Sequence, residues 1–136
     1  MKKVCFLICV LLATISCQNQ ESINLASSPE TVKTALLFPA GLRISQFDEE
    51  GKSMTSSVSE FFFVFLQDGT VTATRTDEVI VGNYFVFSDD GITELRLGFP
   101  KNSPLSELDD DWYFISNDSS SIRFEDNEDV LEFQFL

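Results

Sequence analysis

From Gly41 to the end of the sequence, apolar and polar residues alternate, and this period-two pattern predicts β-strands. Eight segments carry it: 41–47, 61–66, 70–75, 78–87, 93–99, 112–116, 121–125 and 130–136. Polar turn sequences such as "QDG", "SDDG" and "DNED" separate nearly all of them. Short strands joined by tight polar turns indicate an antiparallel meander. We therefore predict a mainly β fold of about eight strands, either an up-and-down barrel or a strongly curled sheet.

The stretch "EFFFVFLQDGTVTATR" allows the register of one hairpin to be predicted. A two-residue turn would place alternate phenylalanines on the same face as the threonines, mixing core and surface. A three-residue loop that ends on a left-handed Gly69 instead pairs Phe65 with Val71 and Phe63 with Ala73. This register is the prediction, because it keeps the apolar residues of both strands on one face.

A helix is predicted over 29–37, before the first strand. Ser28 is suited to the N-cap and Pro29 to the first helical position. Three apolar residues then fall on one helical face: Val32, Ala35 and Leu36. Pro39 ends the helix.

The predicted register leaves three large apolar residues on the outer face of the strand 61–66: Phe62, Val64 and Leu66. Two interpretations stay open. The apolar face of the helix at 29–37 lies across them, or they form a surface that docks a protein partner. Burial would stabilise either arrangement by about 1.5–3 kcal/mol per side chain.

The N-terminal sequence "MKKVCFLICVLLATISC" is typical of a secretory signal peptide. Lys2 and Lys3 precede an apolar run over 4–15, which is shorter than the about 20 residues that a bilayer crossing needs. We predict a signal peptide over 1–16, a polar tether over 17–27 and one β domain over 28–136.

The serine before Cys17 makes the end of this leader resemble a bacterial lipobox, in which the cysteine is acylated and becomes the first mature residue. Cys5 and Cys9 leave with the leader, so Cys17 would be the only cysteine left, and no intrachain disulfide could form. The alternative is ordinary cleavage with Cys17 as a free thiol. Acylation would attach the chain to the membrane. Gln18 is not the aspartate that retains enteric lipoproteins in the inner membrane, so an outer-membrane lipoprotein is expected, on either the periplasmic or the surface side.

The charge of the chain excludes one class of partner. The net charge is −13, and without Lys2 and Lys3 seven basic residues face 22 acidic ones, a net charge of −15. Nucleic-acid binding needs a basic surface to contact phosphates, so nucleic acid is not an expected partner.

Several short sequences resemble small lipocalin-like lipoproteins of Bacteroidetes-type bacteria: "FVFLQDGTVTATR", "GNYFVF", "ELRLGF", "PLSELDDDW" and the closing "VLEFQFL". The resemblance covers about residues 40–136. It implies a calycin-type, lipocalin-like barrel that binds a small apolar molecule or presents a surface. The Gly-x-Trp of such barrels is replaced here by Gly41-Leu42-Arg43, and the acidic export signal after the lipidated cysteine is reduced to Glu21.

The inventory of reactive residues does not favour an enzyme. The chain has no histidine, and it carries no glycine-rich phosphate loop, zinc spacing or other cofactor motif. Glu94 and Glu132 lie within predicted strands, on the faces opposite leucine and phenylalanine, so both are expected to be solvated. The acidic turns at 109–111 and 125–129 do not match a calcium loop. We expect no catalytic site, no metal and no cofactor.

Four aromatic residues are candidates for lining a ligand cavity inside a barrel: Phe63, Tyr84, Trp112 and Phe114. Eight strands enclose room for either side chains or one small ligand, and 14 phenylalanines favour filling. Two hypotheses follow. The protein carries a small hydrophobic molecule, or it is an accessory lipoprotein that docks a partner through Phe62, Val64 and Leu66.

Overall fold

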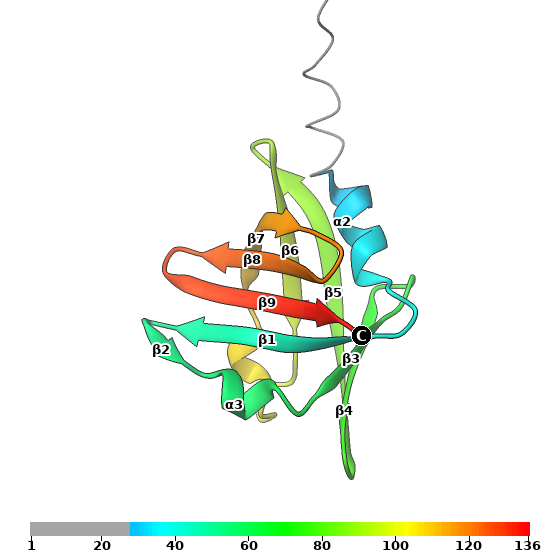
Figure 1. The fold of residues 1–136 in the computed structure, drawn as a ribbon, viewed down its shortest axis with the longest axis vertical. Coiled ribbons are helices and arrows are strands. Elements are labelled where there is room, and N and C mark those ends of the chain that lie inside the picture. Colours follow the sequence, from blue (N-terminus) through cyan, green and yellow to red (C-terminus); the bar gives the residue numbers. More distant parts are fainter. Residues whose placement is uncertain (1–27) are drawn as a thin grey trace, which may run out of the picture.

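A computed structural model of the protein describes residues 28–136; Cys17, the leader and the tether lie outside these residues. Nine antiparallel strands follow one another in a single sheet (Figure 1). Their bounds are β1 Leu42–Glu49, β2 Lys52–Ser53, β3 Phe62–Phe65, β4 Thr70–Arg75, β5 Glu78–Asp89, β6 Ile92–Gly98, β7 Asp111–Asn117, β8 Ser121–Asp126 and β9 Asp129–Phe135. All eight predicted strands are confirmed, and β2 is an addition that the sequence pattern did not reveal.

Strand β1 closes the sheet into a barrel. It pairs with β9 along most of its length, from the Leu42–Phe135 pair to the Asp48–Val130 pair. Its other edge pairs with β3 at two positions and, further along, with β2. The result is a closed antiparallel barrel of eight strands, with β2 as an extra strand. Closure leaves each of the eight strands hydrogen-bonded on both sides.

The predicted register of the β3–β4 hairpin is confirmed. Phe65 pairs with Val71 and Phe63 with Ala73. The loop between these strands has three residues, and Gly69 takes the left-handed conformation with φ 91°. Phe63, Phe65, Val71 and Ala73 are therefore buried together in the core.

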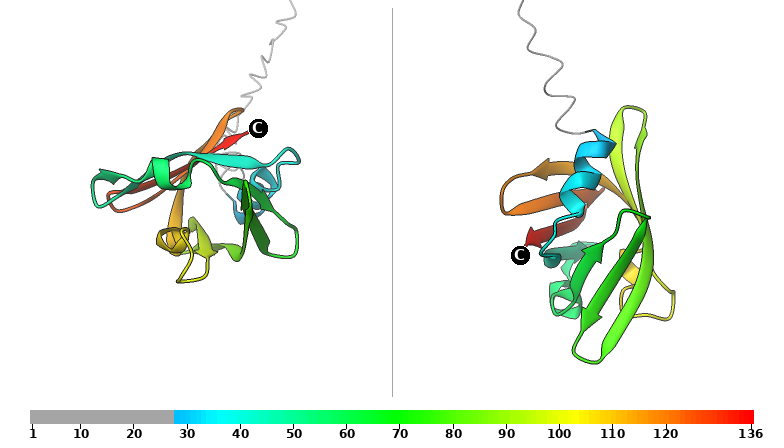
Figure 2. Two further views of the ribbon diagram at one scale, coloured as in Figure 1. Left: turned by 90° about the horizontal axis from the view of Figure 1, so that it is seen from below. Right: turned by 90° about the vertical axis from the view of Figure 1, so that its right-hand side faces the viewer.

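Helix α2 (Pro29–Leu36) closes one end of the barrel (Figure 2). Ser28 caps it as predicted, since its Oγ accepts a hydrogen bond from the Thr31 N–H at 3.3 Å. Val32 and Leu36 are buried with the inward-facing residues of the strands. The prediction that the helix covers Phe62, Val64 and Leu66 is therefore wrong. An open barrel end exposes apolar side chains of many strands at once, and the apolar face of the helix packs there instead.

The other end of the barrel is closed by two short elements that were not predicted. Helix α3 (Thr55–Val58) packs along β1, and η1 (Ser106–Leu108) packs below β6 (Figure 1). Val58 and Leu108 lie in the core. Between its pairings with β3 and β2, strand β1 is bonded to Thr55, whose Oγ1 accepts a hydrogen bond from the Phe47 N–H at 2.9 Å. No helix among residues 28–136 has the length and hydropathy needed to cross a membrane.

The register makes a testable distinction between Phe63 and Thr72. Phe63 is completely buried, whereas Thr72 faces outward on the neighbouring strand. Phe63→Ala should lower the free energy of unfolding by about 3–5 kcal/mol, because it leaves a cavity in the core. Thr72→Ala should cost about 1 kcal/mol or less. Urea denaturation measures both values, and equal losses would contradict the register.

Candidate functional site

The four aromatic residues predicted to line a cavity face the interior of the barrel, where their rings contact other side chains: Phe63, Tyr84, Trp112 and Phe114. Phe63 meets the rings of Phe99 and Phe133 edge to face, with centroids 6.3 and 5.4 Å apart. The Tyr84 hydroxyl donates a hydrogen bond to the carbonyl oxygen of Leu66 at 2.6 Å. Burial raises the pKa of this hydroxyl.

Trp112 and Phe114 lie in separate aromatic contacts. Trp112 is only 1% exposed, packs edge to face with Phe47, and donates a hydrogen bond from Nε1 to the carbonyl oxygen of Leu108 at 3.1 Å. Phe114 is half-buried and packs against Phe124. The structure thus places all four residues inside, but it distributes them among core contacts rather than around one space.

Several depressions lie on the outside of the barrel. One of about 570 Å³ is lined by residues of β5 and β6 and the loop after β6, among them Asn83, Arg96 and Asp109. Another of about 270 Å³ lies between α2 and the β7–β8 turn, with Ala35, Phe38 and Asn117 in its wall. Both are surface hollows that expose polar as well as apolar atoms.

Large apolar side chains are exposed on the outer surface of strands β3 to β7, and we call this set of residues the apolar face. Its exposed members, from 38% exposed at Tyr113 to 64% at Val79, are Leu66, Val79, Val81, Phe85, Ile92, Tyr113 and Ile115. Its half-buried members are Phe62, Val64 and Phe87. Polar rows separate its members: Val64 lies beside Thr72, which lies beside Val81. On the next strand, Arg96 lies beside Phe85.

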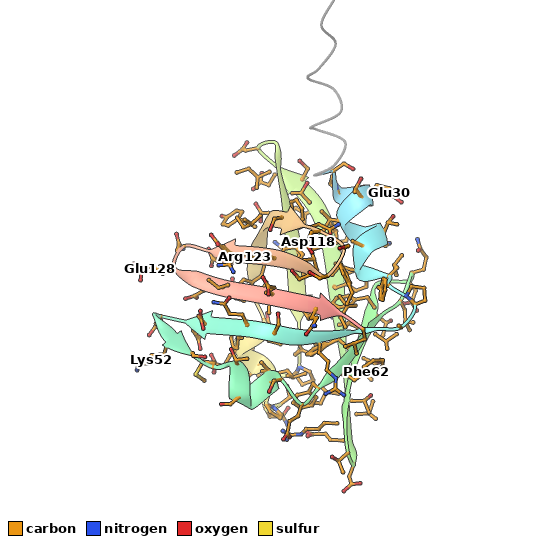
Figure 3. The ribbon with its side chains drawn as sticks, viewed as in Figure 1. Glu30, Lys52, Phe62, Asp118, Arg123 and Glu128 are labelled. Carbon is orange, nitrogen blue, oxygen red and sulfur yellow. The ribbon has the colours of Figure 1, made fainter. Side chains whose placement is uncertain are left out.

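Strands β8, β9 and β1 have a polar outer surface. Arg123 lies at its centre (Figure 3), with Nε 3.1 Å from Glu125 and Nη1 3.8 Å from Glu132. Ser45 donates a hydrogen bond to the Glu132 carboxylate at 2.8 Å, and Gln46 accepts one from Arg123. Polar side chains joined by hydrogen bonds and ion pairs therefore cover this side of the barrel, while β3 to β7 expose the apolar face.

The predicted strip of Phe62, Val64 and Leu66 belongs to the apolar face but forms only its edge. Phe62 is half-buried because its ring lies against the backbone of Gly41, where a Cβ atom would overlap it. Leu66 is 43% exposed. The larger part of the face was missed, although "EVIVGNYFVF" has apolar residues at both odd and even positions. A strand that is apolar on both faces predicts one buried face and one exposed apolar face, and this pattern could have revealed the larger part of the apolar face.

Glu94 occupies an unusual position within the apolar face. Strand pairing puts it in a row between Phe87 of β5 and Tyr113 of β7. It faces outward as predicted, but it is only 6% exposed, so the expectation that it is solvated is wrong. The aromatic neighbours shield it on both sides. No described residue forms a hydrogen bond or an ion pair with its carboxylate.

Burial raises the pKa of Glu94, and the charges of Asp89 and Asp111 raise it further. Arg96 opposes this effect, but its guanidinium is held by Asp111 through hydrogen bonds of 2.6 and 2.8 Å and lies over the Phe87 ring at 5.0 Å. The pKa of Tyr113 is also raised, chiefly by the charge of Glu94. The carboxylates around Glu94 and Tyr113 therefore outweigh Arg96 in their effect on these two pKa values.

Acidic residues also meet at the barrel end that carries η1. Burial raises the pKa of Glu49, and a hydrogen bond to Glu107 raises it further. Burial likewise raises the pKa of Asp126, and the charge of Asp110 adds to this. Within residues 28–136 no group of three or more acidic side chains has a geometry that could hold a metal ion.

Compared with known proteins, the chain matches no family model, no curated protein sequence and no solved structure. The resemblance to lipocalin-like lipoproteins stays a prediction.

Replacing Glu94 should stabilise the protein near neutral pH. The raised pKa means that the folded state binds this proton more tightly than the unfolded state, so ionised Glu94 opposes folding above its folded pKa. Glu94→Gln should therefore raise the urea midpoint at pH 7. The advantage should shrink as the pH falls toward 4.5, the ordinary pKa of glutamate, because the wild-type carboxyl becomes neutral.

The control for this measurement is Glu132→Gln. Glu132 is held by Arg123 and Ser45 on the polar surface, so its replacement should give no gain. A lower urea midpoint for Glu94→Gln at pH 7 would show that Glu94 has a stabilising partner.

Proposed function

We propose that the protein is a lipid-anchored module of the cell envelope that docks a protein partner through its apolar face. The observation that carries this proposal is the contrast between inside and outside. The aromatic residues that could line a ligand cavity are packed against one another, whereas seven large apolar side chains are exposed on one outer surface.

The apolar face has the character of an interaction surface. Single exposed apolar residues are common on monomeric proteins, but seven large ones across five neighbouring strands favour a binding surface. Phe85 is 62% exposed and stacks on Phe87, with centroids 5.7 Å apart. Burying a side chain of this size stabilises a complex by about 1.5–3 kcal/mol. Several such residues on a rigid sheet provide a preorganised site.

The predicted anchor suits such a role. Cys17 lies eleven residues before Ser28, a length of chain that spans at most about 40 Å. Helix α2 begins at the end of the barrel where β5 turns into β6 (Figures 1 and 2). A barrel tethered there stays close to the membrane, and the length of β5 remains accessible to a partner in the same envelope.

A carrier of a small hydrophobic molecule is the second hypothesis. The lipocalin-like resemblance implies it, and the closed barrel of eight strands is compatible with it. A ligand inside would have to displace rings such as Phe63 and Trp112 from their present contacts. The packing of these rings favours the docking function.

Site-specific photo-crosslinking tests the docking function. A p-benzoylphenylalanine at Val81, in the apolar face, should form one discrete adduct in the native envelope. The same group at Gln134, exposed on β9, should form none. Mass spectrometry should identify the adduct. Phe85→Lys should abolish binding to the purified partner, and it should change the free energy of unfolding, measured in urea, by no more than about 1 kcal/mol.

Two results would contradict the proposal. Adducts could form equally at Val81 and Gln134, or a partner could bind Phe85→Lys as tightly as the wild type. A rise in melting temperature with an apolar ligand, lost in Trp112→Ala, would favour the carrier instead.

The anchor is tested separately. Cys17→Ser should abolish metabolic labelling with palmitate and release the protein from the membrane fraction, because acylation needs the thiol. Fractionation with alkaline carbonate, compared with the wild type, gives the measurement. Labelling that persists in Cys17→Ser would show that another residue is acylated.

A further inference from the structure

Strand β5 has partners on both sides, but they do not cover its whole length. On one side it pairs with β4 from Glu78 to Asn83, and on the other with β6 only from Asn83 to Asp89. Among the described residues, 78–82 therefore have no neighbouring strand on the β6 side, and we call this segment the free edge. Figure 2 shows the β4–β5 hairpin extending beyond the neighbouring strands.

The backbone groups of Val79 and Val81 point outward along the free edge. The Tyr84 N–H donates a hydrogen bond to the Gly69 carbonyl oxygen at 2.9 Å, which places the backbone groups of Tyr84 on the β4 side. Successive residues of an antiparallel strand turn these groups to opposite sides, so Val79 and Val81 face away from β4. No described residue forms a hydrogen bond with their N–H or C=O groups on that side.

Strand β6 cannot extend along the free edge. Its pairing with β5 ends where Gly98 lies beside Asn83. Continuing this register would place Pro100 opposite Val81, where a residue without an N–H cannot donate to the ladder. Phe99 instead turns into the core, where it is 4% exposed.

The hollow of about 570 Å³ lies beside the same edge, since its wall includes Val81, Asn83 and Pro100. Neighbouring strands of a sheet lie about 4.8 Å apart, so a further strand needs only a narrow space. The chain therefore leaves open the place that a next strand would occupy.

We propose that the free edge receives an extended segment of the docked partner, which adds an antiparallel strand beside Val79 and Val81. Strand addition gains affinity from backbone hydrogen bonds and specificity from alternate side chains. The side chains of the two valines are 64% and 57% exposed, so apolar residues at alternate positions of the added strand pack beside them. The partner segment is about five residues long, the usual length of a strand. This inference rests on the proposed docking function and adds to it how the partner binds.

A second copy of this chain is a less suitable occupant. The net charge of −13 opposes the association of two copies. Pairing two free edges about a two-fold axis at Ile80 would also place the turn at 76–77 of one copy on Gly98 of the other, which already pairs with Asn83. An extended segment of another protein meets neither obstacle.

Three capped peptides test the free edge. The first has two valines, each between threonines, and a lysine at either end. The second carries N-methyl groups on both valines, and the third carries one on the central threonine. Cross-strand packing aligns the peptide valines with Val79 and Val81, so the valine N–H groups face the free edge and the threonine N–H groups face solvent.

The full-length protein is titrated with each peptide and followed by amide NMR shifts. The first and third peptides should shift the amide signals of Val79 and Val81. The second should bind about tenfold more weakly, because it cannot donate hydrogen bonds to the free edge. Val79→Pro, which removes one edge N–H, should weaken binding of the first peptide several-fold, and the control Val79→Thr should not.

Equal binding of the first and second peptides would overturn the strand addition, and so would the absence of shifts at Val79 and Val81 at millimolar peptide. A dimer in sedimentation, with the amides of these two valines protected from hydrogen exchange, would also overturn it, because a second copy would then be the occupant.

These outcomes are separable from a failure of the docking function. If the apolar face docks a partner through side chains alone, crosslinking at Val81 succeeds and Val79→Pro binds that partner as tightly as the wild type. If nothing docks in the envelope, crosslinking fails, while the difference between the first two peptides still decides whether the free edge accepts a strand.

Discussion

The pairing of β1 with β9 is the constraint on which the rest of the structure depends. It joins the first and last long strands of the chain and closes the sheet. Once the barrel is closed, alternate residues of every strand must point into one small interior. Rings such as Phe63, Phe133 and Trp112 fill that interior, and their neighbours along the strands must face outward. Helix α2 at one end and the short elements α3 and η1 at the other complete the core.

The outward side chains differ between the two sides of the closed barrel. On β8, β9 and β1 the outward residues are charged or polar, and they satisfy one another around Arg123. On β3 to β7 apolar side chains are exposed between threonines and charged residues, and nothing among the described residues covers Val79, Val81 or Phe85. The folded core does not need these side chains. Their exposure is the observation on which the proposed docking function rests.

Local patterns made most of the fold predictable. Period-two alternation located all eight barrel strands, and the requirement for one apolar face gave the β3–β4 register through a three-residue loop. The helix start at Ser28 was equally local, because capping and a proline in the first turn depend on neighbouring residues. What α2 packs against was not predictable, since a helical pattern defines an apolar face but not its contact. Elements as short as α3 and β2 carry too few residues for a periodic signal.

The candidate site was predicted only in part, for the same reason. Phe62, Val64 and Leu66 could be placed on an outer face because their hairpin register was known. The burial of Glu94 could not, because it arises from Phe87 and Tyr113 on two other strands, at registers that only the folded sheet defines. Whether Tyr84 and Trp112 line a space or fill it depends on how rings from several strands meet.

The central claim, that the interior is filled and the apolar face is free, can be measured directly with a soluble paramagnetic nitroxide. In NMR spectra of the full-length protein with labelled side chains, the nitroxide should broaden the signals of Val79, Val81, Phe85 and Ile92 strongly. The signals of Phe63, Tyr84 and Trp112 should remain sharp. Broadening of the interior rings, with protection of Val81 and Phe85, would contradict the account.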